Sequence, residues 1–160
     1  TNRLNSGFER FGWLNVNNRG GVATVNGVRI GFVGIDDMHD GLADLRSIER
    51  TKAELGSVDL HIGVSHAPYL DAINAFNDAE IPVLFAGHTH GGQVCIPGYG
   101  AIVTNCDLPS KAARGLSSWS RNGHQLWLNV CAGLGHSIYA PVRFACRPEV
   151  RVVTLVAKSA

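Results

Sequence analysis

Two histidines follow directly on an apolar run in the middle of the chain. Residues 81–86 read Ile-Pro-Val-Leu-Phe-Ala, and residues 87–92 read Gly-His-Thr-His-Gly-Gly. A buried strand that stops and at once presents two imidazoles is a common way to hold a metal ion, and glycines let the backbone come close to a ligand. A His-x-His pair alone is a weak signal, because a single histidine more often has an ordinary polar role.

A third histidine stands in an equivalent position. His66 comes two residues after the run Val-Asp-Leu-His-Ile-Gly-Val at 58–64. His66 and His88 thus each fall just past the carboxyl end of a predicted strand, the edge at which open α/β sheets bind ligands. Imidazole nitrogens suit Zn, Fe and Mn. His66, His88 and His90 can hold one ion with an open position, whereas two ions also need carboxylates.

Alternating strands and helices position these histidines. Asn26-Gly27 lies between two β-rich runs and predicts a hairpin with a type I′ turn. A helix is expected after Asp40, which can cap it, and before Gly56. A second helix is expected from Pro68 to about residue 79, followed by the strand at 82–87. This order predicts an α/β fold.

The back half of the chain reads mostly as β-structure. Asn122-Gly123 predicts a second hairpin, residues 105–118 read as a polar loop, and residues 149–156 alternate as a half-exposed strand would. We find no repeat or linker, so residues 1–160 are expected to form a portion of a single domain.

Composition narrows the functional classes. A hydrophobic fraction of 45% and a charged fraction of 17% suit a globular core, and a net charge of +1 gives no basic patch for nucleic acid. No apolar run is long enough to span a bilayer, and no signal peptide is recognisable. The four cysteines form no Cys-x-x-Cys pair and are interpreted as buried thiols, with a disulfide as the alternative: Cys95, Cys106, Cys131 and Cys146.

Further polar residues have a functional and a structural interpretation. Asp36 and Asp37 end the second strand and can do acid–base work, accept a hydrogen bond from a metal-bound imidazole, or cap their loop. Arg143 is expected to have a surface or packing role, with phosphate binding by its guanidinium fork as the alternative. His136 can line a cleft or face solvent. The other histidines, His39, His61 and His124, are expected to be structural or solvated.

Several segments together resemble a known family. Residues 63–68 read Gly-Val-Ser-His-Ala-Pro, and residues 86–93 read Ala-Gly-His-Thr-His-Gly-Gly-Gln. With segments 34–37, 96–100, 132–135 and 141–149, they resemble the calcineurin-like metallophosphoesterases. The likeness is greatest to a bacterial, often membrane-associated branch that includes a phosphodiesterase-like group and a UDP-diacylglucosamine pyrophosphohydrolase of lipid A synthesis.

The resemblance implies a fold and a reaction. The fold is a four-layer α/β/β/α sandwich, with His66 and His88 on one metal and His90 on the other. Two divalent or trivalent ions, Mn, Fe or Zn, would activate a bridging water and clamp the phosphoryl oxygens. The substrate would be a small or lipid-linked phosphate with a phosphodiester, phosphomonoester or pyrophosphate bond. The location implied is membrane-associated or extracytoplasmic.

The family's other motifs, Asp-x-His, Gly-Asp-x-x-Asp and Gly-Asn-His, do not occur in these residues. They would supply the bridging Asp, another carboxylate, an Asn ligand and the His that acts as general acid. The chain therefore resembles the carboxyl-terminal half of such a domain, and we expect an uncovered sheet face that favours self-association. The alternatives are an inactive binding module that keeps the fold and a mononuclear zinc hydrolase that uses the three histidines.

Overall fold

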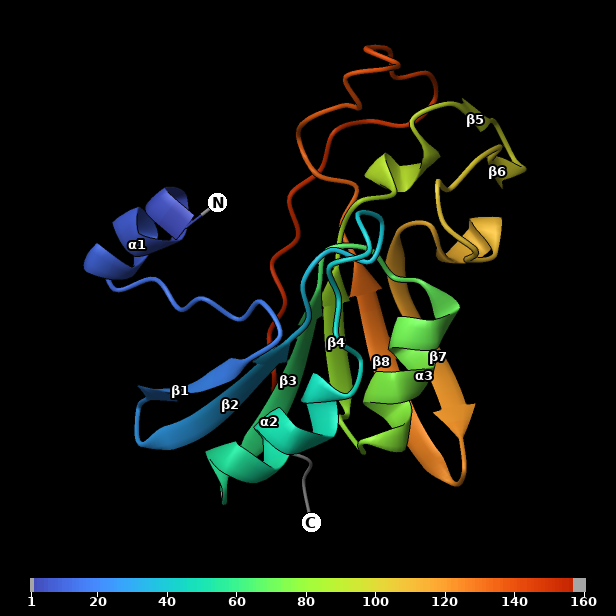
Figure 1. The fold of residues 1–160 in the computed structure, drawn as a ribbon. Coiled ribbons are helices and arrows are strands. Elements are labelled where there is room, and N and C mark those ends of the chain that lie inside the picture. Colours follow the sequence, from blue (N-terminus) through green and yellow to red (C-terminus); the bar gives the residue numbers. More distant parts are fainter. Residues whose placement is uncertain (1, 157–160) are drawn as a thin grey trace.

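A single six-stranded sheet organises the protein in the computed structural model, which describes residues 2–156 (Figure 1). The strand order is β1–β2–β3–β4–β8–β7. The bounds are β1 Gly20–Val25, β2 Val28–Gly34, β3 Leu60–Ser65, β4 Val83–Ala86, β7 Gly115–Arg121 and β8 His124–Val130. The four central strands are parallel, and β1 and β7 pair antiparallel at the two edges. The predicted α/β class is confirmed.

Both predicted hairpins are present at the two Asn-Gly pairs. The φ angles are 52° and 82° at Asn26 and Gly27, and the same two values recur at Asn122 and Gly123. Positive φ at both central positions is the type I′ geometry, whose twist matches that of the flanking strands. β7 begins at Gly115, inside the segment that was expected to be a loop. Its serine-rich sequence suits an edge strand but gives little hydrophobic alternation.

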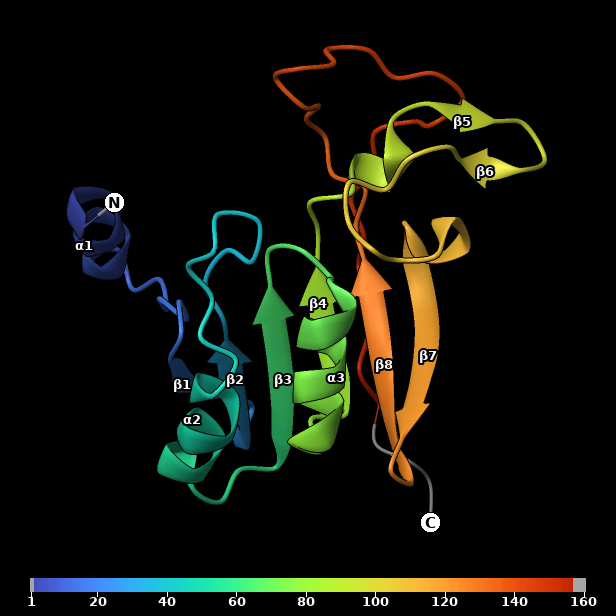
Figure 2. The same ribbon diagram turned by 45° about the vertical axis from the view of Figure 1, so that its right-hand side comes forward.

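Of the three α-helices among residues 2–156, two cover one face of this sheet. The helices are α1 Asn2–Arg10, α2 Ser47–Leu55 and α3 Leu70–Asp78. α2 and α3 lie on the same face, whereas α1 stands apart from the sheet (Figures 1 and 2). Between β4 and β8 the chain makes a long excursion. It contains the 3-10 turns η1 His90–Gly92 and η2 Ser110–Ala112 and the small hairpin of β5 Cys95–Ile96 and β6 Gly100–Ala101.

The start of α2 differs from the prediction. The helix begins at Ser47 and not after Asp40, and the chain before it makes turns at 38–41 and 45–46. The side-chain oxygen of Asn18 accepts hydrogen bonds from the backbone N–H of Asp36 at 3.0 Å and of Asp44 at 2.8 Å. The N–H of Asp44 therefore bonds to Asn18 instead of to a carbonyl one helical turn earlier. A long-range side-chain contact of this kind leaves no periodic signal in the sequence.

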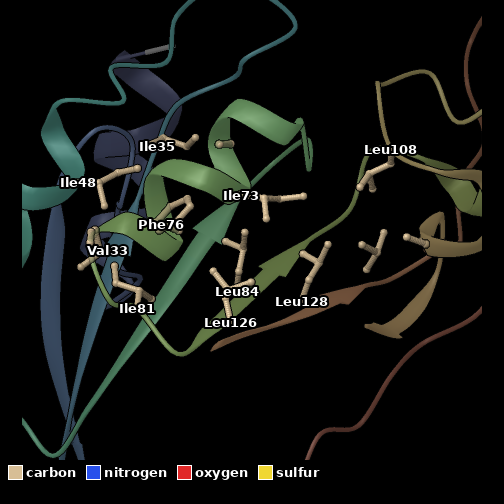
Figure 3. Packing of buried hydrophobic residues seen from close by; sticks show 14 residues of the cluster. Val33, Ile35, Ile48, Ile73, Phe76, Ile81, Leu84, Leu108, Leu126 and Leu128 are labelled. Carbon is tan, nitrogen blue, oxygen red and sulfur yellow. The ribbon is translucent and has the colours of Figure 1, made fainter. Parts of the chain in front are cut away.

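The core lies between the sheet and the two helices (Figure 3). Ile73 and Phe76 of α3 are fully buried against the sheet, where Leu84 and Leu128 are also inaccessible. Complete burial of such a side chain contributes about 1.5–3 kcal/mol. Gly63 makes the close approach of α3 feasible, because a Cβ there would lie 2.9 Å from Cδ1 of Phe76. The core thus fixes β3 and β4 side by side beneath α3.

The opposite face of the sheet is covered only in part. Phe32, Val64 and Phe85 are half-buried there, and Trp127 is 43% exposed. The carboxyl-terminal segment descends along this face (Figure 2) and forms no strand within residues 149–156, contrary to the prediction. It lies over the face, beside Leu116 and Asn129, and not at an edge where a strand could pair. The remaining layers of a sandwich and the expected self-association stay predictions.

No helix within the described part of the chain is long and apolar enough to cross a lipid bilayer.

Candidate metal centre

The strand register brings His66 and His88 together. Ser65 of β3 pairs with Ala86 of β4, so both strands end at the same level and each is followed by its histidine. Nε2 of His66 lies 3.1 Å from Nδ1 of His88, and the two rings meet edge to face. The structure thus places these two predicted ligands at one point on the carboxyl edge of the sheet.

The hydrogen bonding of His88 suits a metal ligand. Its Nε2 lies 3.1 Å from the backbone carbonyl oxygen of Asn105, and an N–H donated there leaves a lone pair on Nδ1, toward His66. Metal-binding histidines commonly donate their second ring N–H in this way. Burial lowers the pKa of His88; the Asn105 carbonyl opposes this effect, and charge on His66 and His39 adds to it. The neutral imidazole that binds metals is therefore favoured.

The spacing of the two nitrogens agrees with a shared ion. Two nitrogens each about 2.1 Å from one metal lie about 3.0–3.4 Å apart for bond angles between a right angle and the tetrahedral value. The observed separation of 3.1 Å falls in this range, and it is also the length of a direct hydrogen bond between the two rings. Two imidazole nitrogens this close, one of them on a ring whose other nitrogen can donate to Asn105, form a donor set that fits a first-row metal ion.

The two aspartates have different roles in the structure. Oδ2 of Asp37 lies 3.8 Å from Nε2 of His66, and its Oδ1 accepts the backbone N–H of His39 at 2.8 Å. Asp36 instead accepts the N–H of Asp37 at 2.8 Å and so stabilises its own loop. Only Asp37 faces the imidazole pair.

Sequence reasoning missed two residues at this edge. His39, expected to be structural or solvated, lies with its ring 5.2 Å from that of His88, and Tyr69 lies 6.4 Å from the same ring. Burial raises the pKa of Tyr69, with Cys106, Asp107 and Asp37 adding to the effect, so its hydroxyl stays protonated. His39 is the third residue after Asp36, and Tyr69 is the third residue after His66. Both therefore follow closely on the end of a predicted strand, and this position was the signal available in the sequence.

His90 does not join the imidazole pair. Within residues 2–156 no three or more His, Cys, Asp or Glu side chains assemble into a group that could hold a metal ion. Burial lowers the pKa of His90, and the charge of Arg143 lowers it further, followed by His88, His66 and His136. The structure thus brings together two of the three predicted ligands, with the third close enough to interact electrostatically.

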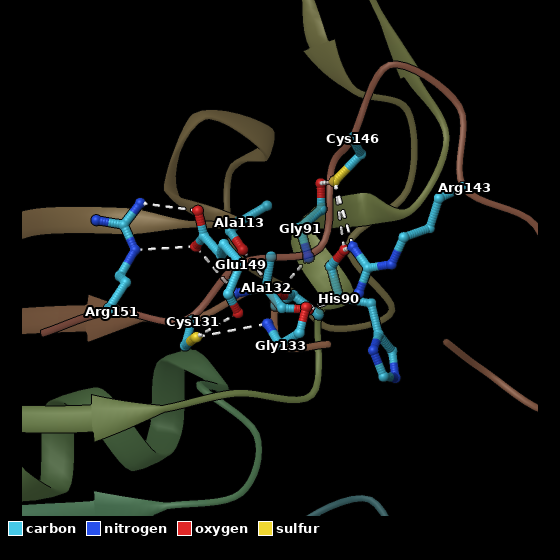
Figure 4. Close-up of polar contacts among 11 residues, drawn as sticks. His90, Gly91, Ala113, Cys131, Ala132, Gly133, Arg143, Cys146, Glu149 and Arg151 are labelled. Carbon is cyan, nitrogen blue, oxygen red and sulfur yellow. Dashed lines mark hydrogen bonds and ion pairs between the residues drawn. The ribbon is translucent and has the colours of Figure 1, made fainter. Parts of the chain in front are cut away.

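Arg143 binds main-chain carbonyls (Figure 4). Its Nη1 donates to the carbonyl of His90 at 3.0 Å, and its Nη2 donates to Ala132 at 2.7 Å and Gly133 at 3.2 Å. Its Nε donates to Gly135 at 3.1 Å. The guanidinium therefore ties the η1 turn to the turn after β8. Of the two interpretations of its sequence position, the geometry favours packing over phosphate binding.

The same turn is enclosed by two buried thiols. Cys95 and Cys146 approach the carbonyl oxygen of Gly91 at 3.3 Å and 3.4 Å. All four cysteines are free, as the first interpretation expected, although Cys106 and Cys131 are only half-buried. Burial raises the pKa of Cys95, and Cys146 adds to the effect, so the thiol stays protonated.

His136 takes no part in the pair. Its side chain is exposed, and its Nδ1 lies 3.0 Å from the carbonyl oxygen of the neighbouring Ser137. Of its two interpretations, the structure gives it the place of an exposed turn residue.

Glu149 fastens the carboxyl-terminal segment and makes stability depend on pH. The hydrogen bond from Arg151 lowers its pKa; burial opposes this effect, and the N–H of Ala132 adds to it (Figure 4). The carboxylate of Glu149 therefore binds a proton more readily in the unfolded state than in the folded state. The stabilisation is complete above the unfolded pKa of about 4.3 and is lost as pH falls through the folded value.

We expect Glu149→Gln to lower the free energy of unfolding by about 1 kcal/mol at neutral pH, and by less in acid. Urea unfolding at several pH values measures this. Glu54→Gln is the control, because the side chain of Glu54 is exposed and its ion pair with Arg50 is long, at 4.0 Å. An equal loss for Glu149→Gln at neutral and acid pH would contradict the assignment.

Two proteins of Bacillus subtilis (strain 168) are similar to this chain. The uncharacterized metallophosphoesterase YkuE is 31% identical over 134 residues, which are 84% of this chain and 43% of YkuE. The uncharacterized protein YpbG is 29% identical over 154 residues, which are 96% of this chain and 52% of YpbG. The chain spans about half the length of these relatives. No family model and no solved structure matches it. The chain is thus similar, over most of its own length, to a protein whose name identifies it as a metallophosphoesterase.

Proposed function

We propose that the protein is a metal-dependent phosphoester hydrolase in which His66 and His88 bind one metal ion. The proposal rests on the 3.1 Å approach of their ring nitrogens at the strand edge. The carbonyl of Asn105, to which Nε2 of His88 can donate, supports it. The likeness to a protein named as a metallophosphoesterase supports phosphoester chemistry over other hydrolytic reactions.

In this proposal, the residues of this chain bind the metal ions and orient the ligands that hold them. His66 and His88 hold the first ion, His90 takes part in a second, and the carboxylate of Asp37 helps to orient the imidazole of His66. Such ions, of which Mn, Fe and Zn fit imidazole ligands, act as Lewis acids toward phosphoryl oxygens and lower the pKa of bound water. Arg143 keeps the backbone of His90 in place.

The proposal gives these residues only part of a dinuclear site. Two metals need bridging carboxylates, and the described residues bring only Asp37 near the imidazole pair. We therefore place the bridging carboxylate and the general acid in a region outside residues 2–156. This fits the coverage of only 43% and 52% of the two relatives. The bond cleaved is a phosphodiester, phosphomonoester or pyrophosphate bond in a small or lipid-linked substrate.

Metal binding by the imidazole pair is the first test. In the full-length protein, we expect His66→Gln and His88→Gln each to weaken Mn²⁺ binding by at least about 100-fold, since loss of a direct ligand exceeds the 10–100-fold effect of losing a supporting residue. Turnover of bis(p-nitrophenyl) phosphate should be lost as well. Titration calorimetry and elemental analysis give the affinity and the metal content.

His124→Gln is the matched control, because His124 begins β8 at the other end of the sheet, where it lies 3.4 Å from Glu80. Unchanged metal content in the double variant of His66 and His88 would refute the proposal. A protein that binds metal through the pair but hydrolyses no phosphoester would favour the alternative of a binding module. The observation behind that alternative is that the described residues contain no complete metal-binding group.

A further inference from the structure

Two side chains outside the expected ligand set meet beside His88. His39 lies in the loop after β2, and Tyr69 lies in the turn that leads into α3, so they come from two different strand-to-helix connections. Nδ1 of His39 and the hydroxyl oxygen of Tyr69 are 3.2 Å apart. Their rings lie 5.2 Å and 6.4 Å from that of His88. Both therefore reach the edge of the sheet at which the imidazole pair lies.

We propose that His39 and Tyr69 together form a hydrogen-bond donor for a non-bridging oxygen of the phosphoester, an inference that rests on the proposed function. The bond between them leaves one donor free whichever way its proton lies. If Tyr69 donates, the neutral imidazole of His39 carries its proton on Nε2. If Nδ1 of His39 donates, the phenolic O–H is free. In both cases the pair presents one neutral N–H or O–H.

The free donor is accessible to a ligand. The side chain of His39 is exposed, and the structure gives its Nε2 no hydrogen-bond partner among residues 2–156. The guanidinium that would suit a phosphate better, that of Arg143, already donates to four carbonyls. A phosphoryl oxygen held beside His88 thus has the His39–Tyr69 pair as a nearby donor with spare capacity.

The pair is also held in place before any ligand binds. Asp37 accepts the backbone N–H of His39 at 2.8 Å, and Asp107 accepts the backbone N–H of Leu70, next to Tyr69, at 2.8 Å. Each loop is therefore fixed by a carboxylate on the main chain. A donor fixed in this way makes its contact without a further ordering cost, as binding sites require.

Because the hydrogen bond between the two side chains holds the free donor in place, and either side chain alone keeps a donor but not this orientation, they should act as a unit. In the metal-loaded full-length protein, we expect Tyr69→Phe and His39→Gln each to weaken binding of inorganic phosphate about tenfold and to raise KM for bis(p-nitrophenyl) phosphate similarly. The double variant should be no worse than either single variant. Calorimetry measures phosphate binding, and elemental analysis should give unchanged metal content.

Tyr139→Phe and His124→Gln are the controls, since Tyr139 is 91% exposed and His124 lies at the opposite end of the sheet. Wild-type phosphate affinity and KM in both single variants would overturn the contact and leave the hydrolase intact. Losses that multiply in the double variant would overturn the shared donor. A protein that binds phosphate through the pair but hydrolyses no ester would instead refute the proposed function and keep the contact. Thermal unfolding confirms that each variant is folded.

Discussion

Arg143→Met is expected to lower the free energy of unfolding by about 3 kcal/mol and to free the main chain at His90. The substitution keeps the aliphatic part of the side chain but removes every donor. The carbonyls of His90, Ala132, Gly133 and Gly135 then lose a charged partner. A hydrogen bond to a charged group contributes about 1.5–3 kcal/mol. Water replaces part of the loss at the exposed Gly135 and the half-buried His90 and Gly133, but not at the buried Ala132.

Two comparisons separate this effect from the loss of a surface charge. Arg147→Met removes the same charge four residues away, from an exposed side chain. Arg143→Lys keeps the charge but replaces a planar fork with a single ammonium group that cannot reach all the carbonyls. Urea unfolding gives the stability, and hydrogen exchange of residues 90–92 and 132–135 reports the two turns. Equal stability of the Arg143→Met and Arg147→Met variants would show that the carbonyl contacts contribute nothing.

Gly92→Ala should be more damaging still, at about 4 kcal/mol. The φ angle of Gly92 is +82°, where a side chain costs about 1–2 kcal/mol. A Cβ at this position would also lie 2.3 Å from the Cβ of Ala101 and 2.9 Å from the carbonyl oxygen of Val103. Because these neighbours are main-chain or Cβ atoms, they move only if the η1 turn separates from β6. That movement would displace His90, so metal affinity should fall together with stability.

The chain contains a matched control for the backbone conformation. Gly123 has the same φ of +82°, but no atom lies within 4 Å of a Cβ placed there. Gly123→Ala should therefore cost only the conformational part, about 1–2 kcal/mol. The difference between the two variants in urea unfolding isolates the steric part. Equal losses would mean that the η1 turn accommodates the methyl group by a small shift.

Local signals in the sequence were sufficient for much of the fold. Asn26-Gly27 and Asn122-Gly123 each identify a hairpin, because a type I′ turn admits few other residues. The apolar runs before His66 and His88 identify the two parallel strands, and the strand-end rule then places the histidines together. These predictions depend on short-range chemistry, which the order of residues records directly.

Features that depend on distant contacts were not predictable in the same way. Asn18 shapes the loop before α2 through two hydrogen bonds to residues far along the chain. The carboxyl-terminal segment has the alternation of a strand but lies over a face of the sheet, where no strand edge is available for pairing. His39 and Tyr69 meet because the register of β2 and β3 aligns the loops that follow these two strands. A packing role for Arg143 could be expected from the sequence, but the four carbonyls that it binds could not be identified there, because three of them belong to turns brought near it by the fold.

The pairing of β4 with β8 has a consequence for the order of folding. Val83 pairs with Trp127, and the whole excursion that contains η1, β5, β6, η2 and β7 lies between these two strands. The entropy of closing so long a loop must be lost before this central parallel ladder can form, whereas the β1–β2 hairpin needs only a two-residue turn. We therefore expect the region around His90 to reach its native arrangement late. The edge of the sheet at which His66, His88 and His90 lie is therefore expected to become complete only with the last pairing of the sheet.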